Sequence, residues 1–256
     1  MPSIRSHRDG DILILTIDNE SRRNAFTSEM TLQLGEALEA AEADGSVRCV
    51  IITGAGKLAF SSGHDLNELL ADRDHAADAK LNAPFYKPRQ MTTPTIAVVN
   101  GAAHAGGFIL ALSCDMRICE PDADFAAPGA RIGLLPIGGQ ISRLPALVPL
   151  GIAYDMLATA RRVTADEAAR HGFVNRIAER GQALEVGLEM ARLIAANSPS
   201  VVAAIKRGLE VFVREGSTAA ERFEWTEGRR LQGGPDADEG VQAFLMKRSP
   251  RFQQKQ

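Results

Sequence analysis

The sequence has little cysteine, and its cysteines are not paired at the spacing of a metal or redox site. All three, Cys49, Cys114 and Cys119, stand in or beside apolar segments of the 256-residue chain. A zinc ribbon or a redox dithiol would need closely paired cysteines. We therefore expect reduced, buried thiols in a cytoplasmic protein, with no metal ion and no prosthetic group.

Long hydrophobic runs and blocks of one charge are also missing. No apolar run approaches the ~20 residues that cross a bilayer, and the N-terminus lacks the apolar core of a signal peptide. With 29 Lys and Arg against 32 Asp and Glu, the formal net charge is −3. These features argue against secretion and against a nucleic-acid or membrane partner. The charge balance does not exclude a small polyanionic ligand, because its binding would need only a few basic residues near the site.

Apolar residues are plentiful, at 45% of the chain, and their pattern alternates between strand and helix. Residues 11–18, 47–53 and 94–100 are predicted strands. A helix is predicted from an N-cap at Thr27 or Ser28, and another runs from Gly106 through Leu112. This alternation predicts an α/β fold with a sheet covered on both faces.

The second half of the chain becomes mainly helical. Thr164 and Glu167 have the spacing of a capping box, 182–196 is amphipathic, and Ser198 with Pro199 is typical of a helix start. We expect an α/β core over 1–198 and a C-terminal helical lobe over 199–256. The segment 70–83, rich in Ala, Asp, Arg and Lys, is either a mobile helix over a pocket or a solvated loop.

Two separate segments each combine an apolar strand, a small-residue turn and a helix start. They read AFSSGHDL over 59–66 and VNGAAHAGG over 99–107. Glycine lets the backbone bend sharply and approach a ligand, and the first amides of a helix lack an intrahelical acceptor. Either segment alone could be an ordinary strand-to-helix turn. Together they predict two backbone amides that share one oxyanion.

These segments resemble the paired oxyanion-hole motifs of the crotonase superfamily, the enoyl-CoA hydratase/isomerase family. Other segments similar to the family follow in the same order: RRNAF at 22–26, CDMRI at 114–118, FAAP at 125–128, IGLLP at 132–136, RL at 143–144, the segment 165–174, and GVQAFLMKR at 240–248. The resemblance implies a spiral of ββα units with a helical trimerisation lobe, assembled as a homotrimer or a dimer of trimers. It also implies that the amides of Ser61 and Gly106 polarise the thioester carbonyl of an acyl-CoA.

The resemblance further implies where coenzyme A binds. Backbone near Arg22, Arg23 and Ala25 would hold the adenine and phosphates, and the two guanidinium groups suit phosphate charge. Either arginine could instead be a solvated side chain. Phe244 and Lys247 match the family's residues that cover the nucleotide from the same or a neighbouring subunit.

The chain departs from the family at its acid positions. The family's hydratases use two glutamates, and these positions are Ile109 and Gly129 here. A third position, an aspartate in some dienoyl isomerases, dehalogenases and naphthoate synthases, is Ile137. General acid–base catalysis contributes ~10²–10⁴ and needs a titratable group near the reacting atoms. The three residues are instead expected to contact the substrate.

Several other residues are candidates for the base or for binding the end of the substrate. His64 or His104 could be a base, since histidine titrates near neutral pH, although His64 could simply face solvent or coenzyme A and His104 could pack against a subunit. Arg131 could bind an anionic substrate tail, whereas Asp65 is more typical of a helix cap.

Three functions therefore remain open. The first is an enoyl-CoA hydratase/isomerase family protein that polarises a thioester. The second is an acyl-CoA thioester hydrolase, or another enolate enzyme, that uses a histidine. The third is a non-catalytic acyl-CoA carrier or sensor.

Overall fold

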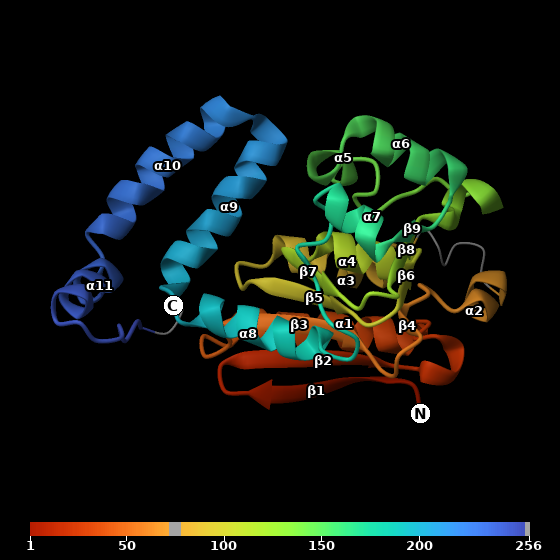
Figure 1. Cartoon of the computed structure of the whole chain (residues 1–256), viewed down its shortest axis with the longest axis horizontal. Helices are drawn as coiled ribbons and strands as arrows, with labels where there is room; N and C mark the ends of the chain where they lie inside the picture. The colour runs from red at the N-terminus through yellow and green to blue at the C-terminus, as the bar shows by residue number, and fades with distance from the viewer. Residues whose placement is uncertain (72–77, 254–256) are drawn as a thin grey trace.

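A six-stranded sheet forms the centre of the fold (Figure 1). The computed structural model describes residues 1–71 and 78–253. The strand order is β1 (Ser3–Asp9), β2 (Ile12–Asp18), β3 (Cys49–Gly54), β5 (Thr95–Val99), β7 (Met116–Cys119) and β10 (Arg176–Ile177). β1 is antiparallel to β2, and the later strands are parallel. The predicted apolar strands β3 and β5 are buried along their whole length.

A smaller, four-stranded sheet contains the two strands that lead into the glycine-containing turns. Its order is β4 (Ala59–Ser61), β6 (Ala102–His104), β8 (Asp124–Ala126) and β9 (Val163–Thr164). β4 and β6 are parallel neighbours, so the turns that follow them leave the sheet at the same edge.

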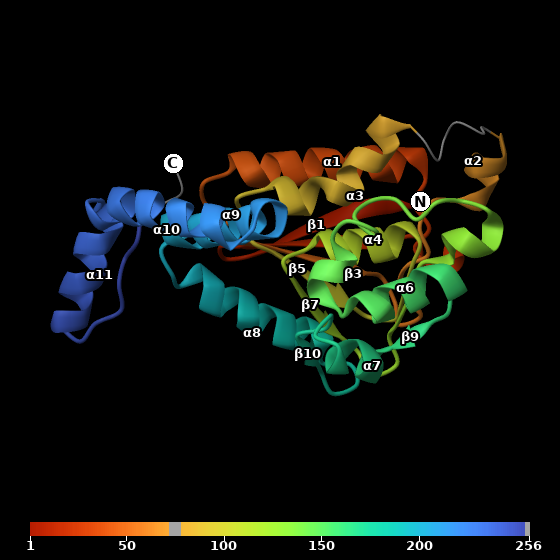
Figure 2. The same ribbon diagram turned by 90° about the horizontal axis from the view of Figure 1, so that it is seen from above.

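Helices cover both faces of the large sheet (Figure 2). α1 (Ser28–Ala43) and α3 (Ala79–Gln90) lie on one face, and α8 (Ala183–Ala195) lies on the other. The first face also packs against α4 (Gly106–Ser113), which is buried along its whole length. Thr27 is the N-cap of α1, as predicted, because its side chain accepts a hydrogen bond from the amide of Met30.

Shorter helices connect these layers. They are η1 (Glu20–Arg22), α2 (Leu66–Ala71), η3 (Pro128–Ile132), α5 (Leu144–Leu147), α6 (Leu150–Thr159) and α7 (Ala165–Arg170). Thr164 caps α7 through the amide of Glu167, as the capping-box spacing predicts. The segment 70–83, predicted as a mobile helix or a solvated loop, includes residues 72–77, which lie outside the described residues. Residues 70–71 are the end of α2, and residues 79–83 are the start of α3.

Three helices at the end of the chain extend away from the sheets. They are α9 (Pro199–Glu215), α10 (Ser217–Gln232) and α11 (Pro235–Leu245). α10 and α11 stand apart from the core in both views (Figures 1 and 2), whereas α9 contacts it. Ser198 caps α9 through the amide of Val201, and Pro199 is its first residue, as predicted. Within the described ranges, none of the helices is both long and apolar enough to span a bilayer.

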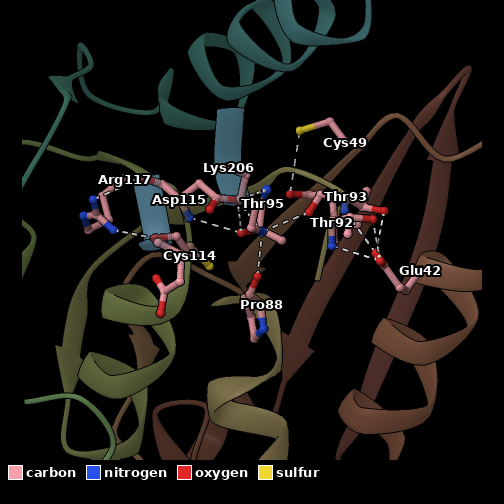
Figure 3. A network of polar contacts seen from close by, with 12 residues as sticks. Glu42, Cys49, Pro88, Thr92, Thr93, Thr95, Cys114, Asp115, Arg117 and Lys206 are labelled. Atoms are coloured by element: carbon pink, nitrogen blue, oxygen red, sulfur yellow. Dashed lines mark hydrogen bonds and ion pairs between the residues drawn. The ribbon is translucent and has the colours of Figure 1, made fainter. Parts of the chain in front are cut away.

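A lysine fixes α9 against the core (Figure 3). Lys206 Nζ donates to the carbonyl oxygens of Pro88 at 2.7 Å and Thr93 at 3.1 Å, and it lies 2.8 Å from Oδ2 of Asp115. The same carboxylate oxygen accepts from the amide of Thr95 at 2.7 Å. One ammonium group therefore joins α9 to the end of α3 and to the strands β5 and β7.

Glu42, near the end of α1, closes the neighbouring turn at 92–93. Its Oε1 accepts from the amide and hydroxyl of Thr92 at 2.9 and 2.6 Å, and its Oε2 from those of Thr93 at 3.0 and 2.8 Å. Burial by itself raises the pKa of Glu42, but these four hydrogen bonds together outweigh it and lower the pKa from 4.5 to about 2.

Replacing Glu42 should therefore cost stability in a pH-dependent way. A pKa that is lower in the folded state stabilises the protein above the unfolded value, and this contribution disappears as the pH falls through the folded value. We expect Glu42→Gln to lower the free energy of unfolding by about 2 kcal/mol at pH 7, with the difference shrinking from about pH 4.5 toward pH 2. Denaturant unfolding over this range checks the result. Glu39→Gln, an exposed change on the same helix, is the control and should show no such trend.

Candidate active site

The two glycine-containing turns are in direct contact. A Cβ atom on Gly63 would lie 2.7 Å from the amide nitrogen of Gly106, and one on Gly107 would lie 2.2 Å from the carbonyl oxygen of Ser61. Real side chains do not approach a backbone this closely, so both positions need glycine. Ala105 precedes α4 with a φ of 49°, and Gly106 is the first residue of the helix.

The contact places Gly63, rather than Ser61, beside the amide of Gly106. Ser61 is in register with Ala103 in the β4–β6 ladder, and its Oγ accepts from the amide of Gly63 at 3.1 Å. The amide of Ser62 donates to the carbonyl of Arg23 at 3.1 Å. Ser61 thus stays the predicted donor, and the proximity of Gly63 makes the next amide, that of His64, a second candidate.

The two candidate histidines lie in different surroundings. The ring of His64 packs edge-on against Phe85, with the ring centres 4.9 Å apart, and a Cβ on Gly106 would lie 3.2 Å from the same phenyl ring. His64 is therefore at the junction of the turns. The Nε2 atom of His104 instead contacts the carboxylate of Asp124 on β8. This places the imidazole of His104 beside the small sheet.

The three positions predicted to correspond to the family's acids lie in the loop 129–138 or against it. A Cβ on Gly138 would lie 2.6 Å from Cγ2 of Ile109, and a Cβ on Gly129 would lie 2.6 Å from the carbonyl oxygen of Leu134 and 3.5 Å from the nitrogen of Pro136. Ile137 follows directly and is exposed. Ile109, in the first turn of α4, is buried in the core cluster. Apolar side chains and backbone thus occupy the region of the family's acids.

Gly129 has no room for a side chain, which gives a direct prediction. We expect Gly129→Ala to lower the free energy of unfolding by about 1–3 kcal/mol, because the new methyl group meets the backbone carbonyl of Leu134. Gly151→Ala on α6 is the matched control, since open space surrounds that glycine. It should be neutral or stabilising by up to about 1 kcal/mol. Equal unfolding curves for the two variants would contradict the close packing at Gly129.

The predicted coenzyme A segment lies against the first turn. Arg22 Nη1 is 2.7 Å from Oδ2 of Asp65, while the side chain of Arg23 is exposed and Ala25 is buried. Oδ1 of Asp65 accepts from the amide of Asn67 at 2.8 Å, in the first turn of α2. That hydrogen bond, together with the one from Arg22, lowers the pKa of Asp65 despite its burial. Asp65 therefore acts as a helix cap.

The other predicted ligand residues are not at this junction. Phe244 and Lys247 lie on and just after α11, at the opposite end of the molecule from α2 in both views (Figures 1 and 2). Phe244 is 83% exposed. Within one chain these two residues do not meet Arg22. A groove of about 600 Å³ does lie among the C-terminal helices, lined by Ser198, Leu231 and Asp236, but it is also remote from Gly106.

Sequence reasoning missed residues on α3 that border the junction. A Cβ on Gly138 would lie 2.7 Å from Cε1 of Tyr86, so Tyr86 and Ile109 meet at the same place. Burial raises the pKa of Tyr86. Arg89 follows on the same face of the helix. The spacing of these residues shows that they share a helix face only if 79–90 is recognised as a helix. Pro84 and Pro88 argue against a helix in the sequence, so this segment is not predicted as one.

Comparisons with known proteins identify the family and the fold of this chain. The sequence matches the enoyl-CoA hydratase/isomerase family over residues 7–255, and the chain belongs to that family. It is 37% identical to a carnitinyl-CoA dehydratase from Salmonella arizonae, over 98% of each chain. Among solved structures, it is similar to an enoyl-CoA hydratase from Polaromonas sp. JS666, with a TM-score of 0.92, 33% identity and coverage of 98% and 100% of the two chains. An enoyl-CoA hydratase from Bacillus anthracis has a TM-score of 0.94 at 28% identity, over 98% of each chain. The crotonase fold predicted from the sequence is thereby confirmed.

Proposed function

We propose that this chain binds an acyl-CoA thioester and polarises its carbonyl with two backbone amides. One donor is the amide of Gly106, and the other comes from the loop 61–64, at Ser61 or His64. The observation that carries the proposal is the contact between Gly63 and the Gly106 amide, which brings both turns to one point. Each donor aimed at a developing oxyanion stabilises the transition state by roughly 3–4 kcal/mol.

The residues that transfer protons in the family's hydratases have no counterpart at the matching positions of this chain. Ile109, Gly129 and Ile137 have no acidic or basic side chain. The chain could therefore polarise the carbonyl, but these three positions would supply no general acid–base catalysis. The relatives named carnitinyl-CoA dehydratase make addition or loss of water on a CoA thioester the first reaction type to test. His64, which lies at the junction, is the proposed base if the chain instead hydrolyses the thioester or performs other enolate chemistry.

The coenzyme would lie between two chains. Arg22, Arg23 and Ala25 border the first turn and would contact the nucleotide and phosphates. Phe244 and Lys247 are remote in their own chain, so they would reach the nucleotide only from a neighbour. We propose that this neighbour belongs to a homotrimer or a dimer of trimers formed through the helices after residue 198. We place this assembly in the cytoplasm.

Isothermal titration calorimetry with butyryl-CoA and free coenzyme A tests the proposal. Butyryl-CoA should bind more tightly, because only the thioester supplies a carbonyl to the amides. Equal affinities would remove the oxyanion site from the proposal. A panel of acyl-CoAs, with products identified by mass, then distinguishes water addition, hydrolysis and binding without turnover.

A further inference from the structure

Arg89, in the last turn of α3, is a largely buried cation that is incompletely hydrogen-bonded within the described residues. Its side chain is 24% exposed, and its Nε atom is buried without a hydrogen-bond partner in the described part of the chain. Oε1 of Glu210 lies 3.8 Å from this atom, beyond hydrogen-bond distance. A buried donor left unsatisfied is destabilising. Because this atom is buried, an acceptor supplied from outside the chain would pair with Nη1 and Nη2 of the same guanidinium.

The carboxylate beside Arg89 is already committed to other arginines. Glu210 accepts from Arg143 Nη1 at 2.9 Å and from Arg214 Nε at 2.8 Å. Burial opposes ionisation of Glu210, but the hydrogen bonds and charges of these arginines outweigh it and lower its pKa. Three guanidinium groups therefore share one carboxylate, and the cluster keeps an excess positive charge.

This cluster lies next to the proposed path of the acyl group. A Cβ on Gly139 would lie 3.4 Å from both Nη1 of Arg89 and Cβ of Arg143. The preceding residue, Gly138, is the one that packs against Ile109. Ile109 is one helical turn beyond Gly106 on α4. An acyl group with its carbonyl at Gly106 would thus pass Ile109 and approach Arg89.

We propose that Arg89, with Arg143 beside it, binds a carboxylate at the far end of the acyl group, so that the preferred ligands are CoA thioesters of short dicarboxylic acids. This inference rests on the proposed function and adds the class of acyl group. A guanidinium pairs with a carboxylate through two parallel hydrogen bonds, which Nη1 and Nη2 of Arg89 can supply. Arg131, the sequence-based candidate for an anionic tail, donates instead to the carbonyl of Ala160 at 3.0 Å.

Calorimetry with matched thioesters tests the proposal. Glutaryl-CoA and pentanoyl-CoA have acyl chains of the same length and differ in the terminal carboxylate. We expect glutaryl-CoA to bind at least about tenfold more tightly, as one charged hydrogen-bonded pair would provide. A thioester ending in trimethylammonium should bind less tightly than pentanoyl-CoA, because its charge is repelled by the cluster.

Variants assign the effect to Arg89. Arg89→Gln should abolish the preference for glutaryl-CoA, so that glutaryl-CoA and pentanoyl-CoA bind with similar affinity, and Arg89→Lys should retain part of the preference. Arg180→Gln is the control, since that exposed arginine pairs with Asp122 far from α3, and it should leave the preference intact. Unfolding curves verify that each variant is folded.

The outcomes separate this inference from the proposed function. Equal affinity for glutaryl-CoA and pentanoyl-CoA, or a preference that survives in folded Arg89→Gln, overturns the dicarboxylate proposal alone, provided that both thioesters bind more tightly than free coenzyme A. If neither thioester binds more tightly than coenzyme A, the proposed oxyanion site fails and this inference fails with it.

Discussion

Crotonyl-CoA is expected to be hydrated by this chain at least about 100-fold more slowly than by a family hydratase that has both glutamates, because general acid–base catalysis contributes ~10²–10⁴. The reason lies at two positions. Ile109 is buried and apolar, and Gly129 has no side chain. Loss of the ultraviolet absorbance of the conjugated thioester measures the rate, with a two-glutamate hydratase assayed in parallel.

Rapid hydration by the unmodified chain would contradict this expectation. His64→Ala and His104→Ala would then locate the base. The variant in which both Ile109 and Gly129 become glutamate should raise the hydration rate only if the loop 129–136 moves, since any Cβ on Gly129 meets the carbonyl of Leu134. Ile109→Glu alone should not raise it, because the two acids act as a unit. Its carboxyl group would also be buried among apolar side chains, which raises its pKa.

Gly106→Pro should reduce any turnover of an acyl-CoA by about 100- to 1,000-fold, the effect of removing one oxyanion donor. Proline removes the amide hydrogen and is accepted at the first position of many helices, but Ala105 before it has a φ of 49°, so an unfolding curve must verify that the variant is folded. The advantage of butyryl-CoA over free coenzyme A in binding should disappear as well.

Gly106→Ala is the matched control for this change. It keeps the N–H group and adds a methyl group 3.1 Å from Cα of Gly63 and 3.2 Å from the Phe85 ring, so it measures the steric cost alone. If both variants lose activity equally while folded, the loss is steric. If Gly106→Pro retains full activity, the amide of Gly106 is not a donor.

Local signals made much of the fold predictable from sequence. The N-caps Thr27 and Ser198 and the buried strands β3 and β5 each depend on a few neighbouring residues, and the structure has all four. Strand β1 was missed because most of it is exposed at a sheet edge and lacks a clear apolar alternation. Helix α3 was missed because it contains two prolines.

The candidate site was less predictable, because it depends on contacts between distant segments. The repeated strand-turn-helix pattern suggested that 59–66 and 99–107 meet, but it did not show that Gly63 is the residue beside Gly106. The side chain of Arg131 donates to the carbonyl of Ala160, the residue that follows α6, and a contact between such distant segments cannot be read from the sequence. Arg89 on α3 and Glu210 on α9 are distant in the sequence, so no local pattern shows that this carboxylate lies beyond hydrogen-bond distance of the Arg89 Nε atom.

The contact between Gly63 and the Gly106 amide also has a consequence for engineering the acyl specificity of this fold. Carbonyl polarisation there would come from main-chain atoms, whose positions are set by Gly63 and Gly107, where a Cβ atom does not fit. The nearby groups that would select the acyl chain, on Tyr86, Arg89 and Ile109, are side chains on two helices. A library that varies these three positions and keeps the glycines would therefore explore new acyl specificities without disturbing the step common to all of them.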